Sequence, residues 1–364
     1  MNRHDKNQTT SGAEQAQVIY LGLDVHAEQI TVCRQIDGRA PQPAQRFGWV
    51  EFLSWVKKPF ASGARVYSCY EAGPFGYGLH RQLTALGVEN YVVAPQLWDE
   101  RGTRVKTDPR DARELCVRLE RYVCGQHHAF CVVRVPSLEE EARRALCRQR
   151  GAVVRSRQQA ARRGRSLLLI EGHRVRGKWW APQLWARLAA TLCEPLRGRV
   201  ELWQRCALWH DAQEKILRAQ IEALAPREVP VGLGALSSVV MGSEVLDWGR
   251  FKNRRQVASY TGLCPSEHSS GARRRQGSIN RHGNPRLRHA LIETLWRLVR
   301  WQPTCHLCKK FPILLDPHAD SRQRRRAAVA AARLLAIDQW RLATGQTTPK
   351  ALGLRLPLPP TTQR

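Results

Sequence analysis

The sequence predicts an α/β domain followed by two helical parts, and three observations support this fold class. Apolar runs that suit strands come first and are then interleaved with amphipathic segments over residues 18–135, which indicates a mixed sheet. A strongly basic segment with helical spacing follows at 136–227. A small, mainly helical domain is expected at 228–346. We expect disordered tails at 1–17 and 347–364, because the first is polar and the second is rich in Pro and Thr.

The first domain opens with two apolar runs that suit an antiparallel pair. Residues 18–24 form a short run that ends in Asp24, and residues 29–36 alternate apolar and polar side chains. The break between them is short enough for a hairpin. A turn at Asp37-Gly38 then opens a third strand.

Helices and strands alternate in the rest of this domain. We expect helices at 49–58 and 77–86, since both segments have helical spacing. Strands are expected at 65–71 and 91–94, and the first of them ends in Glu71.

Residues 104–113, RVKTDPRDAR, carry two acids three positions apart. Asp108 before Pro109 is typical of a helix start, with Asp108 as the N-cap, and Asp111 would share its face. Two interpretations therefore stay open, a capped helix start and a pair of ligands for one hard cation. The neighbouring bases, Lys106 and Arg110 among them, suit a partner that carries phosphate.

The acids at the strand ends favour the metal interpretation. Acids that end strands of one mixed sheet converge on one edge, although each of them alone suits a solvated loop. Asp24, Glu71, Asp108 and Asp111 together would supply the oxygen ligands that Mg²⁺ prefers, with a substrate phosphate completing the shell. Metal ions bridging that phosphate would stabilise the attacking and leaving oxygens of a phosphoryl transfer.

The charge of the chain indicates a polyanionic partner. Lys and Arg number 59 against 31 Asp and Glu, which gives a formal net charge of +28. Nucleic acid explains such an excess better than a membrane surface does, because the bases are spread over most of the chain. We expect no membrane span and no secretory signal, since no apolar run reaches about 20 residues and the N-terminus is polar.

The cysteines point to a reducing compartment. There are 11 of them, without a repeating spacing, which is typical of free thiols in the cytoplasm. Cys305 and Cys308 form a close pair with His306 and His318 nearby, so a zinc site and plain buried thiols are the alternatives.

The middle of the chain predicts a helical hairpin or coiled coil from residues 138–178 and 191–225. Residues 143–178 hold twelve bases and one acid, which suits a nucleic-acid backbone. Trp179 and Trp180, in the connection, suit either stacking on bases or packing at the hairpin tip. The residues expected to contact nucleic acid here are Arg143, Arg144, Arg155, Arg162 and Arg163.

The last domain combines helices with a basic loop region. Helices are expected at 251–260, 286–300 and 327–342. Between them lies Ser269-Ser270-Gly271, which suits either an ordinary turn or a serine nucleophile whose neighbouring guanidinium groups stabilise developing charge. The arginines expected to contact phosphate are Arg273, Arg274, Arg275, Arg281 and Arg286.

Four segments resemble one known family. YLGLDVHAEQITVC (20–33), YEAGPFGYGLHRQL (70–83) and KTDPRDARELC (106–116) resemble the RuvC-like domain, of the RNase H fold, in DEDD-type insertion-sequence transposases. Residues 250–293 resemble the C-terminal serine domain of the same family, which comprises bridge-RNA-guided recombinases. The resemblance extends from about residue 18 to residue 345, and both motif sets occur in the family's order. One departure is Asn280-Arg281-His282, where Thr or Ser followed by Lys is more familiar.

The resemblance implies a site and a mechanism. It places the four acids on Asp24, Glu71, Asp108 and Asp111, and the nucleophile on Ser269 or Ser270, with Ser269 preferred. It implies Mg²⁺, a covalent phosphoserine, and dimers that assemble to a tetramer in which two subunits complete each site.

The same resemblance implies the partners and the setting. A structured guide RNA would pair with element and target DNA, in a cytoplasmic bacterial protein associated with the nucleoid. Two alternatives to this transposase are a RuvC-like nuclease without a covalent intermediate and a nucleic-acid-binding protein without catalysis.

Overall fold

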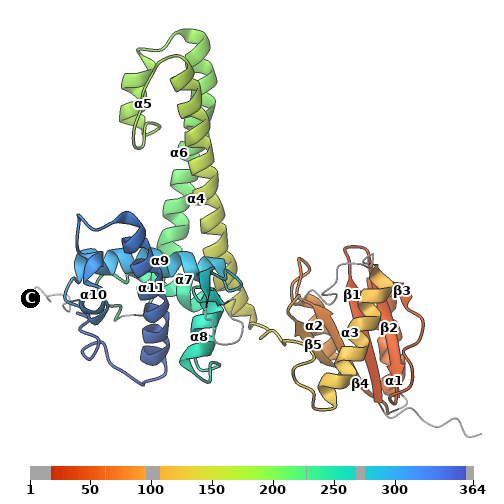
Figure 1. Ribbon diagram of the computed structural model, residues 1–364. Coiled ribbons are helices and arrows are strands. Elements are labelled where there is room, and N and C mark those ends of the chain that lie inside the picture. The colour runs from red at the N-terminus through yellow and green to blue at the C-terminus, as the bar shows by residue number, and fades with distance from the viewer. Residues whose placement is uncertain (1–17, 62, 96–106, 227, 268–274, 358–364) are drawn as a thin grey trace, which may run out of the picture. The chain divides into compact units, whose positions relative to one another are not determined.

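The computed structural model describes residues 18–61, 63–95, 107–226, 228–267 and 275–357. The chain divides after Val135 into two compact units, and each is described by itself (Figure 1). The expected tail at 1–17 lies outside the described residues.

The first unit contains the expected mixed sheet. Its five strands have the order β3-β2-β1-β4-β5. β1 pairs antiparallel with β2 and parallel with β4, so the predicted hairpin and the mixed character of the sheet are confirmed. The strands are β1 (Val18–Val25), β2 (Gln29–Ile36), β3 (Gln45–Gly48), β4 (Arg65–Glu71) and β5 (Glu89–Val93).

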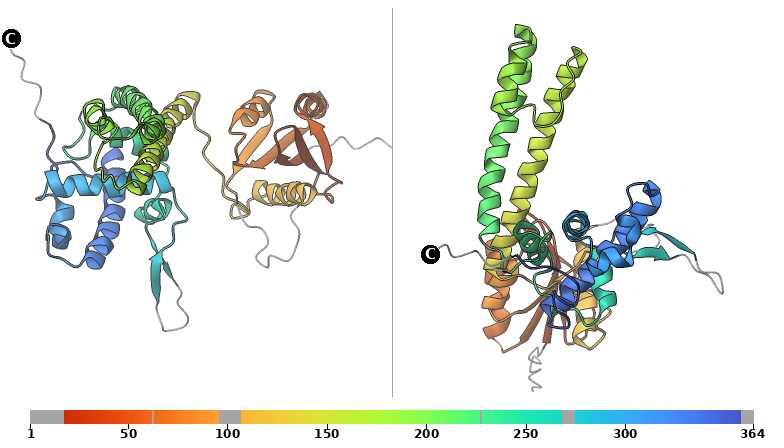
Figure 2. Two further views of the ribbon diagram at one scale, coloured as in Figure 1. Left: turned by 90° about the horizontal axis from the view of Figure 1, so that it is seen from above. Right: turned by 90° about the vertical axis from the view of Figure 1, so that its left-hand side faces the viewer.

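Helices cover both faces of this sheet (Figure 2). α1 (Trp49–Ala61) and α2 (Gly78–Ala85) pack on the face that carries Leu21 and Leu23 of β1. α3 (Asp108–Val123) packs on the opposite face, which carries Tyr20. This division follows from strand geometry, because successive side chains of a strand point to opposite faces.

Gly22 lets α3 approach β1 closely. A Cβ atom at this position would lie 2.1 Å from the carbonyl oxygen of Ala112 and 2.4 Å from the backbone nitrogen of Cys116. No side chain fits that space without moving the helix backbone. The absence of a side chain at Gly22 therefore fixes the distance of α3 from the sheet.

The second unit begins with the expected hairpin, whose helices α4 (Leu138–Ile170) and α6 (Glu194–Glu222) pack along each other. α5 (Pro182–Ala189) lies in the connection between them. Trp179 and Trp180 are buried there against α4, so packing at the tip is the confirmed alternative for them. Although α4 has 33 residues, neither it nor any other helix in the described ranges is long and apolar enough to cross a membrane.

The rest of the second unit is mainly helical, as expected, around one apolar core. The region predicted as loop also contains a short two-stranded ribbon. The last long helix begins at Ser321 and not at residue 327. The elements are α7 (Ala235–Val245), α8 (Arg254–Thr261), β6 (Pro265–Glu267), β7 (Gln276–Ile279), α9 (Pro285–Trp301), α10 (His306–Lys310), η1 (Pro312–Leu314) and α11 (Ser321–Ala343).

The prediction of a disordered tail at 347–364 is wrong for residues 347–357, which pack on the second unit. Leu352 is buried, and its carbonyl oxygen accepts a hydrogen bond from the backbone nitrogen of His306 at 3.1 Å. The carbonyl of Arg355 accepts one from Val231 at 3.0 Å. Burial of Leu352 and these backbone bonds hold the segment on the domain, which the Pro-rich composition did not reveal. Residues 358–364 lie outside the described ranges.

Candidate catalytic site and nucleic-acid interface

Asp24 is the next-to-last residue of β1, and Glu71 is the last residue of the adjacent parallel strand β4. Leu23 of β1 pairs with Tyr70 of β4, so Asp24 and Glu71 follow at the same level of the sheet. By strand alternation, both lie on the face that α3 covers, together with Tyr20 on β1.

The first turn of α3 carries Asp108 and Asp111. Thr107 is the N-cap, its side chain makes no capping hydrogen bond, and Asp108 is the first helical residue. The prediction that Asp108 is the N-cap is therefore wrong by one position, since Thr107 is itself a capping residue type. Both acids still lie where the helix dipole favours negative charge.

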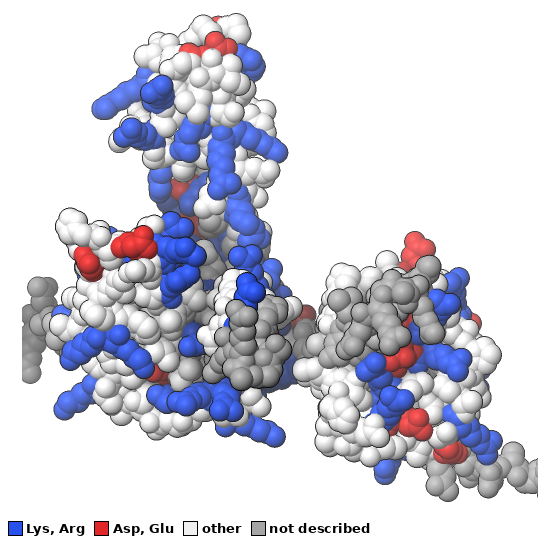
Figure 3. All heavy atoms as spheres, viewed as in Figure 1, with Lys and Arg blue, Asp and Glu red and all other residues white. Residues whose placement is uncertain are grey.

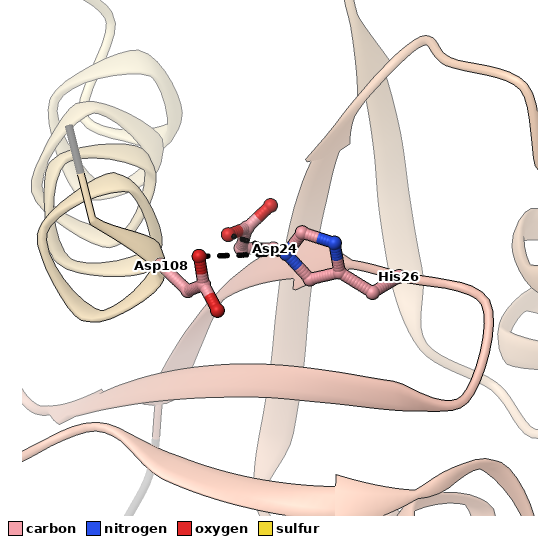
Figure 4. Close-up of side chains that lie close together, drawn as sticks. All are labelled: Asp24, His26 and Asp108. Atoms are coloured by element: carbon pink, nitrogen blue, oxygen red, sulfur yellow. Dashed lines mark hydrogen bonds and ion pairs between the residues drawn. The ribbon is translucent and has the colours of Figure 1, made fainter.

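The structure brings Asp24 and Asp108 together with His26 (Figure 4). The Nε2 atom of His26 lies 3.2 Å from Oδ2 of Asp24 and 3.6 Å from Oδ1 of Asp108. Arg46 of β3 places an Nη2 atom 3.9 Å from Oδ2 of Asp108. His26 was not among the predicted site residues, although its position two residues after a candidate ligand, in the turn after β1, was a usable signal.

Glu71 and Asp111 are half-buried and lie outside this close cluster. The structure thus joins two of the four predicted acids in one cluster with His26. One ligand atom from each of Asp24, His26 and Asp108 lies within 4.8 Å of the others. Bonds of about 2.1 Å place neighbouring ligands of one octahedral ion about 3 Å apart and opposite ones about 4 Å apart, so these side chains fit a divalent cation.

Cys305 and Cys308 do not form a comparable cluster. Both are buried with their Sγ atoms 3.6 Å apart, and His306 pairs with Asp338 at 3.2 Å. Within the described ranges, the group with metal-binding spacing is the one at Asp24. Buried thiols are therefore the interpretation that the structure favours, and burial raises the pKa of Cys308 to about 12.

Ser269 and Ser270 lie outside the described residues, as do Lys106, Arg273 and Arg274. The residues that flank the serine segment are described, and Glu267 of β6 pairs with Gln276 of β7. The serine segment therefore joins two strands whose facing ends are held side by side.

The base of this ribbon is tightly built. A Cβ atom at Gly283 would lie 2.2 Å from the backbone nitrogen of Gly262, so the two glycines allow the chain segments to touch. The backbone nitrogen of Asn284 donates to the carbonyl of Tyr260 at 2.9 Å, and that of Asn280 donates to Cys264 at 2.9 Å.

A buried carboxylate connects this base to the hairpin. Glu244 of α7 is 1% exposed and accepts two hydrogen bonds from Arg148 of α4, at 3.1 and 3.0 Å. Asn284 Nδ2 donates to the same carboxylate at 2.9 Å, while Asn284 Oδ1 caps α9. Burial alone would raise the pKa of Glu244, but the hydrogen bonds from Arg148 and Asn284 outweigh burial and hold that pKa below its usual value.

Other arginines of α4 also point inward. Arg157 contacts Asp211 of α6 at 2.6 Å and Glu214 at 3.7 Å, and Arg150 pairs with Glu214. Part of the basic charge that the sequence assigned to nucleic acid is therefore used inside the unit. Arg144, one of the predicted contact residues, donates to the carbonyl of Ser243 at 3.2 Å.

The remaining predicted basic residues lie on the surface. Lys and Arg side chains follow the length of the hairpin (Figure 3). Arg163 is exposed and its guanidinium lies 4.8 Å from the ring centre of Trp203. The other exposed predicted residues are Arg110, Arg143, Arg155, Arg162, Arg275, Arg281 and Arg286.

Comparison with known proteins decides the family. Residues 229–308 match the model of the "Transposase IS116/IS110/IS902 family". The chain is 32% identical over 298 residues to "Putative transposase y4rJ" of Sinorhizobium fredii, which covers 74% of this chain and 75% of that protein. This chain belongs to the IS116/IS110/IS902 transposase family.

Two further relatives agree with this assignment. "Putative transposase y4qE" of Sinorhizobium fredii is 33% identical over 66% of this transposase, which spans 60% of that relative. "Transposase for insertion sequence element IS1111A" of Coxiella burnetii is 26% identical over 90% of each chain. The range that matches the family model contains the serine segment, its ribbon and Glu244.

Proposed function

We propose that this transposase cuts and rejoins DNA through a serine of the segment 268–274, Ser269 before Ser270, assisted by Mg²⁺ at the acids of the first unit. The observation that carries the proposal is the meeting of Asp24 and Asp108 at the edge of the sheet where Glu71 also ends a strand. The serine half of the proposal rests on the resemblance of residues 250–293 to a serine transposase domain.

The serine oxygen would attack a DNA phosphorus atom and lose its proton, as the bond from phosphorus to a deoxyribose oxygen breaks and that oxygen takes up a proton. A deoxyribose hydroxyl then attacks the phosphoserine, which joins the new strand and restores the serine. Asp24 and Asp108 would hold the ion, with Glu71 and Asp111 beside them. A bound Mg²⁺ supplies positive charge to the phosphate oxygens. Arg275, which is exposed and directly follows the serine segment in sequence, would neutralise the same charge, and Arg281, exposed at the base of the ribbon, would meet the neighbouring phosphate backbone.

The wider parts of the proposal follow the resemblance. The first unit would be an RNase H or RuvC-like domain, and its sheet with three parallel-paired strands and helices on both faces supports this. A structured guide RNA would bind the exposed arginines of the hairpin. Dimers would assemble to a tetramer on the bacterial nucleoid, so that the acids and the serine of different subunits meet on one phosphate.

Covalent capture tests the serine chemistry. Ser269→Ala and Ser270→Ala are each incubated with element-end DNA and Mg²⁺, and protein linked to DNA is measured after denaturation. We expect one variant to lose the adduct and the other to keep it. Cleavage by both variants without an adduct would point to a water nucleophile instead, and an unchanged adduct in both would refute the serine mechanism.

Sequencing of RNA that co-purifies with the full chain tests the guide. Enrichment of one structured RNA from the flank of the element is expected. Recovery of random cellular RNA alone would contradict guided recombination.

A further inference from the structure

His26 occupies a distinct place in the candidate metal site, because its imidazole nitrogen lies close to two carboxylates. We propose that His26 is a third protein ligand of the ion, and that it makes the site prefer a first-row transition ion such as Mn²⁺ to Mg²⁺. This inference rests on the proposed function, since it uses the metal site at Asp24 and Asp108.

The geometry directs the imidazole at the site. The same atom, Nε2, approaches both carboxylates, at 3.2 Å from Asp24 and 3.6 Å from Asp108, so it faces the space that an ion would share with them (Figure 4). In the Nε2–H tautomer this atom donates a hydrogen bond to Oδ2 of Asp24, and a bound ion would take the place of that proton. The side chain stays partly open, with 45% of it exposed, so an ion with its waters can reach the cluster.

The turn that carries His26 is held in place. The indole Nε1 of Trp49 donates to the carbonyl of His26 at 3.2 Å and to that of Ala27 at 3.1 Å. The backbone nitrogen of His26 donates to the carbonyl of Gln29 at 2.9 Å. These contacts hold the backbone of the turn, so the imidazole extends from a fixed position near the two carboxylates.

The types of ligand atom determine which ion the site binds more tightly. Oxygen ligands suit Mg²⁺ and Mn²⁺ alike, whereas imidazole favours first-row transition ions, and Mg²⁺ keeps its waters in preference. Replacing one water by His26 therefore stabilises bound Mn²⁺ more than bound Mg²⁺. The four-acid set that the sequence predicts would not make this distinction.

The opposite role for His26 predicts the opposite result. If His26 served only as a hydrogen-bond donor to Asp24, it would occupy a carboxylate oxygen that a cation needs and would compete with the ion. Removing it would then raise the affinity for both ions. The sign of the change thus separates a metal ligand from a hydrogen-bond donor to Asp24.

Metal binding to the full chain tests the proposal without an activity assay. Binding of Mn²⁺ is followed by the electron paramagnetic resonance signal of the free ion at about pH 8, where histidine is ordinarily neutral, and Mg²⁺ is measured by competition. We expect His26→Ala to weaken Mn²⁺ binding by about tenfold or more, with a change of less than about threefold for Mg²⁺. His306→Ala is the matched control, because His306 also lies 3.2 Å from one carboxylate, in the second unit.

Each outcome bears on a different claim. Unchanged or stronger Mn²⁺ binding by His26→Ala overturns the ligand role of His26 and leaves the acid site standing. Asp24→Asn should lose both ions. If Asp24→Asn binds both ions as the parent chain does, or if the parent chain binds neither ion, then the metal site of the proposed function is wrong. The ligand role of His26 is then wrong as well.

Discussion

Gly22 controls the distance between the two elements of the candidate site, because only a hydrogen atom fits where another residue would carry Cβ. β1 carries Asp24 and α3 carries Asp108, and the two elements touch backbone to backbone at Gly22, Ala112 and Cys116. A change in the distance between β1 and α3 therefore changes the distance between the two carboxylates.

Gly22→Ala should push α3 away from β1 and destabilise the first unit. The added methyl group would meet backbone atoms at 2.1 and 2.4 Å, and overpacking of this kind costs about 3 kcal/mol. Hydrogen exchange followed by mass spectrometry should show faster exchange in peptides from β1 and α3. Gly48→Ala is the control, because a Cβ atom at Gly48 of β3 meets nothing within 4 Å, and it should leave exchange unchanged. Equal protection in both variants would contradict the packing argument.

Individual site residues could be predicted from the sequence where their role follows from their immediate neighbours in the chain. Asp24 and Glu71 were found because an acid that ends an apolar run is visible in the sequence. His26 was missed because its value depends on Asp108, which is distant in sequence and meets it only after folding. Asp108 was predicted as the N-cap because Pro109 follows it, but Thr107 is also a capping residue type, and local preference did not place the helix start one residue earlier.

Elements were predicted well where apolar side chains recur, and less well where charge dominates. β1, β2, β4 and β5 follow apolar runs that the sequence shows, whereas β3, which is QRFG and mostly exposed, begins at Gln45, well after the turn at Asp37-Gly38 that was expected to open it. α11 begins at Ser321, before the apolar pattern starts, since its first two turns are basic and Asp320 caps them. The arginines of α4 were assigned outward because their partners, Asp211 and Glu214, lie more than fifty residues away.

Glu244 ties the elements of the second unit together and should make that unit sensitive to acid. Its pKa is held below the ordinary 4.5, so its ionised form stabilises the fold above that pH, and the stabilisation is lost as pH falls through the folded pKa. Asp211 acts in the same direction, because Lys215, Lys178 and Arg157 outweigh its burial and lower its pKa.

Urea unfolding at pH 7 and at about pH 4 tests this coupling. The urea midpoint of the second unit should fall in acid. Glu244→Gln should lower the free energy of unfolding at pH 7 by up to about 3 kcal/mol and reduce the dependence of that free energy on pH. Glu222→Gln is the control, since Glu222 pairs with Arg218 in a solvent-accessible i,i+4 ion pair on α6. An unchanged pH dependence in Glu244→Gln would show that the network does not couple α4, α7 and α9.

For the whole molecule, the net charge of +28 overstates what is free to bind nucleic acid. Arg148, Arg150 and Arg157 neutralise acids inside the second unit, whereas Arg155 and Arg162 of the same helix are exposed. α4 therefore has an inner set of arginines that holds the hairpin and an outer set that can meet phosphate. The two sets predict different losses when they are changed.

Replacement of the outer set should weaken binding without weakening the fold. Arg155→Gln with Arg162→Gln is expected to lower the slope of log affinity against log salt by about 1 to 2, since each lost phosphate contact removes about 0.9 from it. The melting temperature should stay unchanged. Fluorescence anisotropy with duplex DNA and with structured RNA, at several salt concentrations, measures the slope for each partner.

Arg157→Gln is the matched variant, because it should lower the stability of the hairpin and leave the salt dependence of nucleic-acid binding unchanged. It leaves Asp211 and Glu214 short of a buried partner, which costs about 3 kcal/mol of hairpin stability, while the outer arginines remain. Its salt slope should therefore equal that of the parent chain wherever the hairpin stays folded. If the outer pair leaves the slope unchanged for both nucleic acids, the hairpin does not contact phosphate, and its exposed charge serves another partner than the one proposed.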